Sequence, residues 1–461
     1  MSVRDPMQAN RRAFLRRAAQ LGVAGVAAPW AINLASIGEA AAFGATDYKA
    51  LVCVFLYGGN DYGNTVLPYD AANYARYAAI RTGIATPRDS LAATVLTPQL
   101  ALPGGMQLAL APELAPLKPL FDAGKLAVQL NVGPLVVPTT LAQYTAQSVP
   151  LPPKLFSHND QQSVWQASSP EGAVSGWGGR IGDMALSNNG NAVFTCISVS
   201  GNAVFVAGRT AAQYQISTTG AVPISAVRNP VYGSSALAAA LQAQATQSSA
   251  HVLENEHARI TQRSIASEAL VSGALAALPA LATPFPTTGN SLASQLQMVA
   301  RLIAARNVLS ARRQVFFVSL GGFDLHDFLP DQHPGLLTNV GAALSAFYDT
   351  TVELGVSNSV TAFTASDFGR TLASNGDGSD HGWGSHHFVV GGAVQGGRFY
   401  GTAPAIAVNG PDDVGQGRLL PTTSVDQFAA TLARWFGVSA SELSTVVPGI
   451  GNFSTQNLGF V

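Results

Sequence analysis

Three continuous apolar runs along the chain predict strands that are buried on both faces. They cover residues 51–56, 315–320 and 359–365, and none of them carries a charge. Strands covered by helices on both faces form such runs, whereas half-exposed strands alternate apolar and polar side chains. Two further strands are expected over 125–132 and near 388–390. Together these segments indicate a mostly parallel sheet.

Helical periodicity separates the strands. In residues 291–312 and 335–354, apolar side chains recur at intervals of three and four, as on the buried face of a helix. Strand and helix alternate at both ends of the chain, which predicts an α/β fold with a doubly wound, mostly parallel sheet. The middle, residues 190–290, is expected to be a helical and hairpin insertion, with the hairpin over 191–206. The other helices are expected over 113–123, from 157 toward Trp165, over 251–281 and over 425–436.

The first 42 residues are expected to be an export signal. Arg11 and Arg12 precede a weakly apolar, Ala/Gly-rich run over 18–34, and an Ala-x-Ala site follows at 40–42. This order is typical of a cleaved signal and resembles a twin-arginine signal. We therefore expect a periplasmic or secreted protein that meets the twin-arginine translocase during export. Residues 43–461 are expected to fold as a single domain.

Composition narrows the function classes. The net charge is −1 and only 11% of residues are charged, without a basic or acidic run. Binding to nucleic acid or to an anionic membrane is therefore not expected, and no segment after the signal predicts a membrane span. Cys53 and Cys196 lie in apolar runs, which favours two buried thiols over a disulfide. There is no dinucleotide-binding glycine motif after a strand and no haem or iron–sulfur cysteine set, so an oxidoreductase lacks support.

Acidic and imidazole side chains follow the predicted strands. Parallel strands place their carboxyl ends along one edge of a sheet, so these side chains are expected to meet there. Carboxylate oxygens and imidazole nitrogens are ligands for divalent metals such as zinc, calcium or manganese. The candidate ligands are Asn60, Asp61, Asp324, His326, Asp367, Asp380, His381 and His386.

A second kind of candidate lies at the predicted helix start near residue 157. Ser157 sits where a helix dipole favours an anion, so it is a candidate nucleophile or substrate-orienting residue, with His158 beside it. The alternatives are that Ser157 only caps the helix and that His158 is a surface histidine. Asp61 likewise has the alternative of a turn residue.

The order of these motifs resembles a known family, the exported bacterial proteins grouped as domain of unknown function 1501. The likeness spans nearly the whole chain after the signal. The matching segments are Phe55-Leu56-Tyr57-Gly58-Gly59-Asn60-Asp61 with Asn64-Thr65, Ser157-His158 with Trp165, Gly176-Trp177-Gly178-Gly179-Arg180, Gly321-Gly322-Phe323-Asp324-Leu325-His326, Asp367-Phe368-Gly369-Arg370, and Asp380-His381-Gly382 leading to Gly391-Gly392.

The family is similar, more distantly, to the alkaline phosphatase and sulfatase superfamily. This similarity implies an α/β sandwich with metal ligands at strand ends, with Asn60 or Asp61 as an early ligand and Ser157 as the nucleophile. It implies that His381, His386 or His387 supplies a late ligand. The close spacing of Asp324 and His326, and Phe368 where a histidine follows the aspartate in the superfamily, leave the number of metal ions open.

The resemblance implies two alternative functions. The first is an exported, metal-dependent hydrolase of phosphate or sulfate esters, in which Arg180 or Arg370 clamps the anion. The second is a catalytically inactive scaffold that binds cell-envelope glycans or another exported protein.

Overall fold

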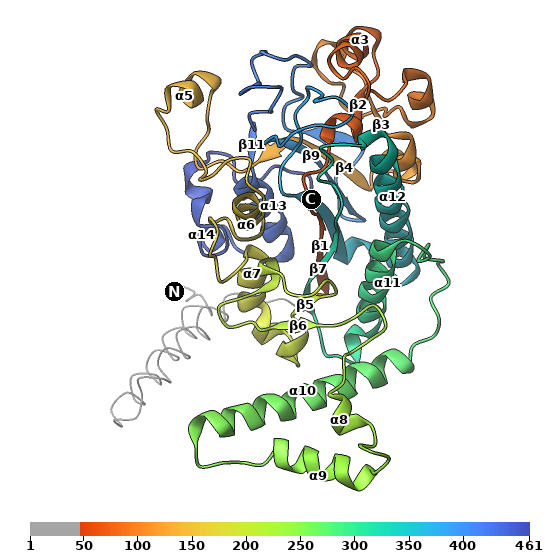
Figure 1. Cartoon of the computed structure of the whole chain (residues 1–461), viewed down its shortest axis with the longest axis vertical. Helices are drawn as coiled ribbons and strands as arrows, with labels where there is room; N and C mark the ends of the chain where they lie inside the picture. The colour runs from red at the N-terminus through yellow and green to blue at the C-terminus, as the bar shows by residue number, and fades with distance from the viewer. Residues whose placement is uncertain (1–46) are drawn as a thin grey trace, which may run out of the picture.

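A nine-stranded mixed sheet forms the centre of residues 47–461, which the computed structural model describes (Figure 1). The predicted export signal lies outside these described residues. The strand order is β10-β4-β9-β8-β1-β7-β5-β6, with β11 paired to β4. The strands of this sheet are β1 (Lys49–Leu56), β4 (Leu126–Gly133), β5 (Cys196–Ser198), β6 (Gln213–Gln215), β7 (Arg313–Leu320), β8 (Val360–Ser366), β9 (Ser385–Gly391), β10 (Arg398–Tyr400) and β11 (Thr423–Ser424).

The centre of the sheet is parallel, as predicted. Strand β1 pairs in parallel with β7 on one side and with β8 on the other, so that Leu56 lies level with Leu320 and Ser366. Strand β9 runs antiparallel to both β8 and β4. A separate small antiparallel sheet joins β2 (Val66–Pro68) to β3 (Leu108–Leu110). The in-register parallel trio brings three chain segments out of the sheet at the same edge.

Helices cover both faces of the sheet (Figure 1). Helices α11 and α12 pack on one face, and α6, α7, α13 and α14 lie on the other. The helices are α3 (Ala71–Ile80), α4 (Lys118–Asp122), α5 (Leu141–Ala146), α6 (His158–Ala167), α7 (Trp177–Ala185), α8 (Ser225–Arg228), α9 (Ser235–Ala245), α10 (Val252–Ala276), α11 (Ser291–Ala304), α12 (Leu329–Glu353), α13 (Val425–Phe436) and α14 (Leu443–Val446).

Strand β1 shows why the central strands read as continuous apolar runs. Val52 and Val54 belong to the core beneath α11 and α12, whereas Cys53 and Phe55 belong to the core on the opposite face. Alternate side chains of a strand point to opposite faces, so a strand covered on both needs apolar residues throughout. This requirement explains why the sequence pattern located the centre of the sheet.

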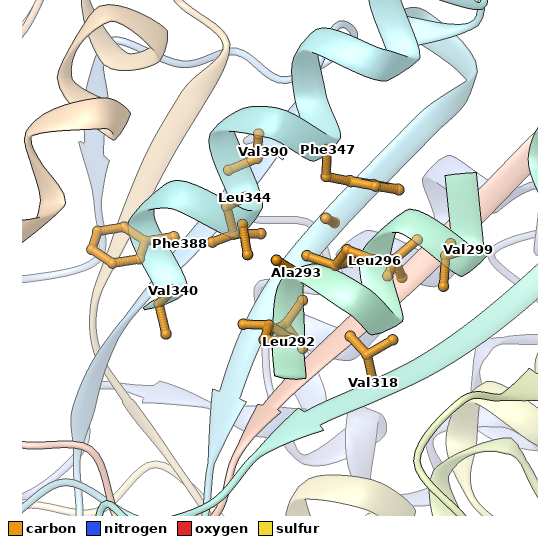
Figure 2. Close-up of a cluster of buried hydrophobic side chains, with 14 of the residues drawn as sticks. Leu292, Ala293, Leu296, Val299, Val318, Val340, Leu344, Phe347, Phe388 and Val390 are labelled. Carbon is orange, nitrogen blue, oxygen red and sulfur yellow. The ribbon is translucent and has the colours of Figure 1, made fainter. Parts of the chain in front are cut away.

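Figure 2 shows the first of these cores where α11 crosses the sheet beside α12. Leu292, Leu296 and Val299 of α11 recur on one side of the helix and are fully buried. They meet Leu344 and Phe347 of α12, with Val318 and Val390 contributed by the sheet. The apolar side chains that predicted a helix over 291–312 thus form the contact surface of α11, which ends at Ala304.

The middle of the chain departs from the hairpin prediction. Residues 191–206 do not form a hairpin; instead β5 pairs in parallel with β7, and β6 pairs in parallel with β5. These two short strands extend the main sheet, so the projecting part is smaller than 190–290. It consists of α8, α9 and α10, which lie to one side of the sandwich (Figure 1).

The remaining element predictions differ mainly at their ends. Helix α13 has the predicted bounds, whereas α12 starts six residues before the predicted 335 and contains Pro334. Cys53 and Cys196 are free and buried, which agrees with two thiols and not with a disulfide, and burial raises the pKa of both. Within residues 47–461, no helix combines the length and apolar character that crossing a bilayer requires.

Removing a side chain from the α11 core tests this account of the fold. Leu296→Ala should lower the free energy of unfolding by about 2–5 kcal/mol, because the surrounding core cannot close fully around the lost atoms. Val352→Ala on α12 is the control, because Val352 is 52% exposed and should change stability by less than about 0.5 kcal/mol. Urea unfolding followed by circular dichroism measures both; equal effects would contradict the burial described here.

Candidate metal centre

The candidate site lies where β1, β7 and β8 end, beside the first turn of α6. Asp324 and His326 follow β7, Asp367 directly follows β8, and His158 is the first residue of α6. His381 lies in the loop before β9 and is held beside Arg370 by an isolated antiparallel bridge. Segments more than 200 residues apart in the sequence therefore meet at one edge of the sheet.

Ring nitrogens from three histidines converge on the carboxylate of Asp324. Nε2 of His158 lies 3.4 Å from Oδ2, while Nε2 of His326 and of His381 lie 3.1 and 3.2 Å from Oδ1. His326 Nε2 and His381 Nε2 are 2.9 Å apart. Ligand atoms of His158, Asp324 and His381 all lie within 4.8 Å of one another. This group, with His326, is called the histidine cluster below.

The opposite nitrogen of each ring is held by an acceptor outside the cluster. Nδ1 of His158 lies 2.6 Å from Oδ2 of the buried Asp367, and Nδ1 of His381 lies 2.8 Å from the carbonyl oxygen of Phe156. Nδ1 of His326 lies 3.2 Å from Oδ1 of Asp380. Histidines that ligate metals usually donate their other N–H to a carboxylate or carbonyl in this way, which fixes the tautomer and the ring orientation.

These hydrogen bonds leave the cluster with more acceptors than protons. A carbonyl oxygen only accepts, so His381 Nδ1 carries a hydrogen and neutral His381 presents a lone pair at Nε2. That lone pair faces Asp324 Oδ1 and His326 Nε2, and His326 Nδ1 already faces a carboxylate. Without a cation, extra protons have to separate these acceptors. A cation among them satisfies all of the facing acceptors at once.

The pKa values of His158 and His381 shift in opposite directions. The hydrogen bond to Asp367 raises the pKa of His158, against the opposing effect of burial, whereas burial lowers the pKa of His381. Burial disfavours ionisation of Asp324, but the hydrogen bond and charge of Arg370 outweigh it and lower the pKa of that carboxyl. The cluster thus holds an ionised carboxylate beside a neutral imidazole.

The donor set fits a small divalent ion with a preference for nitrogen. Metal–nitrogen bonds of about 2.0–2.1 Å place tetrahedral ligands roughly 3.3 Å apart, which is close to the 3.1, 3.2 and 3.4 Å separations around Asp324. The two imidazoles and one carboxylate of His158, His381 and Asp324, whose ligand atoms lie within 4.8 Å of one another, suit zinc with a fourth position open, whereas calcium needs six to eight oxygens. Because His158, Asp324, His326 and His381 are 24–45% exposed, one side of the cluster is open to solvent.

Arg370 is a buried neighbour of the cluster. Its Nη1 donates to Asp324 Oδ1 at 2.6 Å and to the Gly58 carbonyl at 3.2 Å, and Nη2 donates to the Ser379 carbonyl. Its side chain is fully buried. Arg370 therefore positions Asp324, and its guanidinium is already engaged by protein groups.

Two glycines allow the turn after β1 to approach the site. Gly58 and Gly59 have φ values of +115° and +86°, which side chains disfavour. A Cβ at Gly58 would lie 2.3 Å from the Asp324 backbone nitrogen, and one at Gly59 would lie 2.4 Å from the Phe368 ring. The glycine pair of the first motif thus sets how closely β1 and β7 segments meet at the site.

Several residues predicted to bind metal or substrate lie elsewhere. Asn60 and Asp61 are buried, with Asn60 hydrogen-bonded to His333 and Asp61 ion-paired with Arg81. His386 is buried in β9, where its Nδ1 accepts from the Asn131 backbone N–H at 3.1 Å. None of the hydrogen bonds or ion pairs described for these residues reaches the histidine cluster.

Ser157 and Arg180 also have other partners. Ser157 is the N-cap residue of α6 and directly precedes the candidate ligand His158. Its hydroxyl donates to Asp160 Oδ2 at 3.2 Å. Arg180 is buried in α7 and donates to the carbonyls of Ala167, Ser175 and Val446. Its burial lowers its pKa to about 10. Arg180 thus ties α7 to its neighbours.

The structure adds three residues that the sequence motifs did not single out. Gln162 donates to Asp367 Oδ2 at 2.8 Å, Phe156 supplies its carbonyl to His381, and Asn375 donates to Asp380 Oδ1 at 3.0 Å. Gln162 lies one helical turn after His158, so its position on the same face of α6 was a usable signal. The roles of Phe156 and Asn375 depend on loop conformation.

Taken together, the fold and the cluster define an α/β protein with a candidate metal centre at the carboxyl ends of parallel strands. The chain belongs to the family described as "Protein of unknown function (DUF1501)", whose model matches residues 48–449. This confirms the family resemblance seen in the sequence motifs. A search of curated proteins gave no match.

Three solved structures show distant similarity. Ps i-CgsB in complex with k-i-k-neocarrahexaose has 8% identity and a TM-score of 0.35, over 88% of this chain and 77% of the other. The lipoteichoic acid synthase LtaP from Listeria monocytogenes has 8% identity and a TM-score of 0.30, over 91% and 76%. A mutant of the alkaline phosphatase PafA has 11% identity and a TM-score of 0.28, over 71% and 64%.

Loss of the Asp367 carboxylate should weaken metal binding without removing a ligand. Asp367→Asn keeps the side-chain shape but lowers the basicity of His158, so zinc affinity should fall about 10–100-fold. Competition with a chromogenic chelator measures the affinity, and Asp349→Asn near the far end of α12 is the charge-matched control. Unchanged affinity in Asp367→Asn would contradict the orienting role.

Three buried histidines outside the cluster should make the fold sensitive to acid. Burial lowers the pKa of His333 and His386 to about 4 and that of His387 to about 3. Their pKa is near 6.5 when unfolded. Below that value the unfolded chain binds protons that the folded chain does not, so stability falls as the pH drops from about 6.5 toward 4, by about 1.4 kcal/mol per pH unit for each histidine.

The predicted loss of stability at low pH is tested by measuring the free energy of unfolding as a function of pH, with a chelator present to remove metal ions. His333→Gln should reduce the slope between pH 6 and 4.5 by about one proton. The exposed His257→Gln is the control and should leave it unchanged. Equal slopes for wild type and both variants would show that His333 does not stay neutral in the folded protein.

Proposed function

We propose that the histidine cluster binds one zinc ion and that the protein hydrolyses phosphate or sulfate esters. The observation that carries this proposal is the convergence of three Nε2 atoms on Asp324, with each Nδ1 held by an outer acceptor. A bound zinc ion supplies a Lewis acid for a substrate oxygen and lowers the pKa of a water molecule. The partial exposure of the cluster gives a substrate access to it.

The protein's own residues fix the geometry of this centre. Asp367 and Gln162 hold His158, the Phe156 carbonyl holds His381, and Arg370 holds Asp324. Each ligand is therefore oriented before a substrate arrives, which keeps the reorganisation during reaction small. Ser157 remains our candidate nucleophile because it directly precedes His158, and Asp160 is in place to accept its proton.

Charge balance favours a substrate with one negative charge. The group contains three carboxylates, of which Asp324 pairs with the buried guanidinium of Arg370, while Asp367 and Asp380 pair with His158 and His326. A divalent ion brings this group to neutrality, so no excess positive charge is left for a dianion. We therefore expect sulfate monoesters or phosphodiesters to react better than phosphate monoesters.

We also propose that the protein works outside the cytoplasm. The support is the arginine pair, apolar run and Ala-x-Ala site of residues 1–42. The twin-arginine translocase would be its partner during export. Anionic esters of the cell envelope or its surroundings would then be the accessible substrates.

Metal content and turnover of matched variants test the proposed hydrolase. Purified protein should contain about one zinc per chain and hydrolyse p-nitrophenyl sulfate or bis-p-nitrophenyl phosphate. His381→Ala should lose the zinc and reduce turnover at least about 100-fold, because a ligand is removed. His257→Ala, which removes an exposed histidine of α10, should retain both zinc and turnover.

Ser157→Ala separates the nucleophile from the metal centre. If Ser157 attacks the ester, this variant should keep its zinc and lose turnover at least about 100-fold. Retained turnover would assign the attack to water. Folded protein that binds no zinc and turns over none of these esters would contradict the proposal and support the inactive glycan- or protein-binding scaffold.

A further inference from the structure

Exposed large apolar side chains concentrate in residues 222–270, on the projecting helices α8–α10 and on the segments before and between them. The structure exposes thirteen such side chains over residues 47–461, and eight of them fall between residues 222 and 270. Monomeric proteins rarely gather exposed apolar residues on one projection without a partner. The eight are Val222, Ile224, Tyr232, Leu237, Val252, Leu253, Ile260 and Leu270.

A stripe along α10 is covered in one half of the helix and open in the other. In the second half, Ser267, Val271 and Ala274 are buried, and the last two belong to the core beneath α11. Leu253 and Ile260 occupy the same heptad positions as Ser267 and Ala274, yet they are 75% and 46% exposed. The face that docks α10 on the body therefore continues past the body without cover.

Charges on the open half have a symmetrical arrangement. Glu256 and Arg263 lie on the same side of α10 as Ile260, at nearly equal distances before and after it. Both are exposed, and neither forms an ion pair within residues 47–461. If a second α10 crosses antiparallel with the twofold axis between Arg259 and Ile260, Glu256 of each helix lies opposite Arg263 of the other. In the same register Leu253 lies opposite Ala266.

We propose that two copies of this chain pair through the open half of α10. The two helices run antiparallel about a twofold axis near Ile260, and the contact spans residues 253–266. A twofold interface requires a self-complementary surface, and this stretch is one in both apolar and charged positions. The contact length is about 20 Å at 1.5 Å per residue.

The three helices α8–α10, called the arm below, are already held together by hydrogen bonds and an ion pair before a partner binds. Arg228 of α8 pairs with Glu268 of α10, and Gln262 of α10 donates to the Thr246 carbonyl at the end of α9 at 2.6 Å. These bonds hold the three helices together on the faces of α10 that the proposed partner does not use. Association then requires little additional ordering.

Charge makes a membrane a poorer occupant of this surface. Residues 222–276 carry three arginines and three glutamates, so the arm has no net charge. Interfacial helices on anionic membranes have a basic polar face. The paired signs on α10 favour another copy of the same helix instead.

Sedimentation equilibrium of the full exported chain tests the proposal. Wild type should dimerise in the micromolar range. Ile260→Asp should raise the dimer dissociation constant at least about tenfold, because it places two carboxylates at the centre of the α10–α10 interface. Val352→Asp, which changes an exposed apolar residue on α12, is the matched control and should leave dimerisation unchanged.

Charge reversal tests the antiparallel register. Glu256→Arg should weaken the dimer about tenfold by facing two arginines. The double variant Glu256→Arg/Arg263→Glu should restore it, because opposite charges again face each other. A further readout is Ile260→Cys, which should form an intermolecular disulfide under mild oxidation, whereas Val352→Cys should not.

Three results would overturn the proposal. They are a monomer at all concentrations up to 100 µM, a dimer unaffected by Ile260→Asp, and a double reversal that does not recover dimerisation. Binding of a monomeric chain to neutral or anionic vesicles would assign the surface to a membrane instead. Circular dichroism of each variant verifies that the exposed substitutions leave the fold intact.

Discussion

The parallel pairing of β1 with β7 and β8 is the constraint on which the rest of the structure depends. Because Leu56, Leu320 and Ser366 lie level in the sheet, the three following segments leave it together. Asp324, Asp367 and Arg370 then need only short loops to meet. A slip of one residue in either pairing would turn every side chain of the strand to the other face, so burial on both faces protects the register.

The second constraint is electrostatic. The histidine cluster gathers imidazole nitrogens around one carboxylate, and outer acceptors use the opposite nitrogen of each ring. Such an arrangement is unfavourable without added protons or a cation, because lone pairs face each other at close range. It lies at the edge of an otherwise well-packed sheet. Functional sites are where a fold tolerates such local conflict.

The sequence predicted the core better than the site because the two depend on different information. Continuous apolar runs and helical periodicity are local signals, and they located β1, β7, β8, α11 and α13. The antiparallel direction of β9 and the parallel pairing of β5 with β7 are long-range properties. No local pattern distinguishes the short strand β5 from part of a hairpin.

At the site, the motifs found the residue types but not their partners. Asp324, His326, Asp367 and His381 come together, whereas Asp61 pairs with Arg81, twenty residues later in a segment without a motif. His386 and His387 are neighbours on a strand, so their side chains point to opposite faces and cannot share a ligand. Recognising that β9 begins at Ser385 would have separated them from His381.

The groups that accept a hydrogen bond from Nδ1 of each histidine differ in how firmly the fold holds them. This difference ranks the three histidines by how rigidly each ring is supported. Asp367 follows β8 directly and is fully buried, so His158 has the most rigid support. The Phe156 carbonyl belongs to a residue with φ of +70°, a conformation that side chains disfavour, so His381 depends on a strained loop. Asp380 is 38% exposed and is held by Asn375 from the same loop, which leaves His326 with the weakest support. The histidine next to the sheet, His158, is therefore held rigidly. His326 is held less rigidly on the side that is open to solvent, where a substrate has to enter.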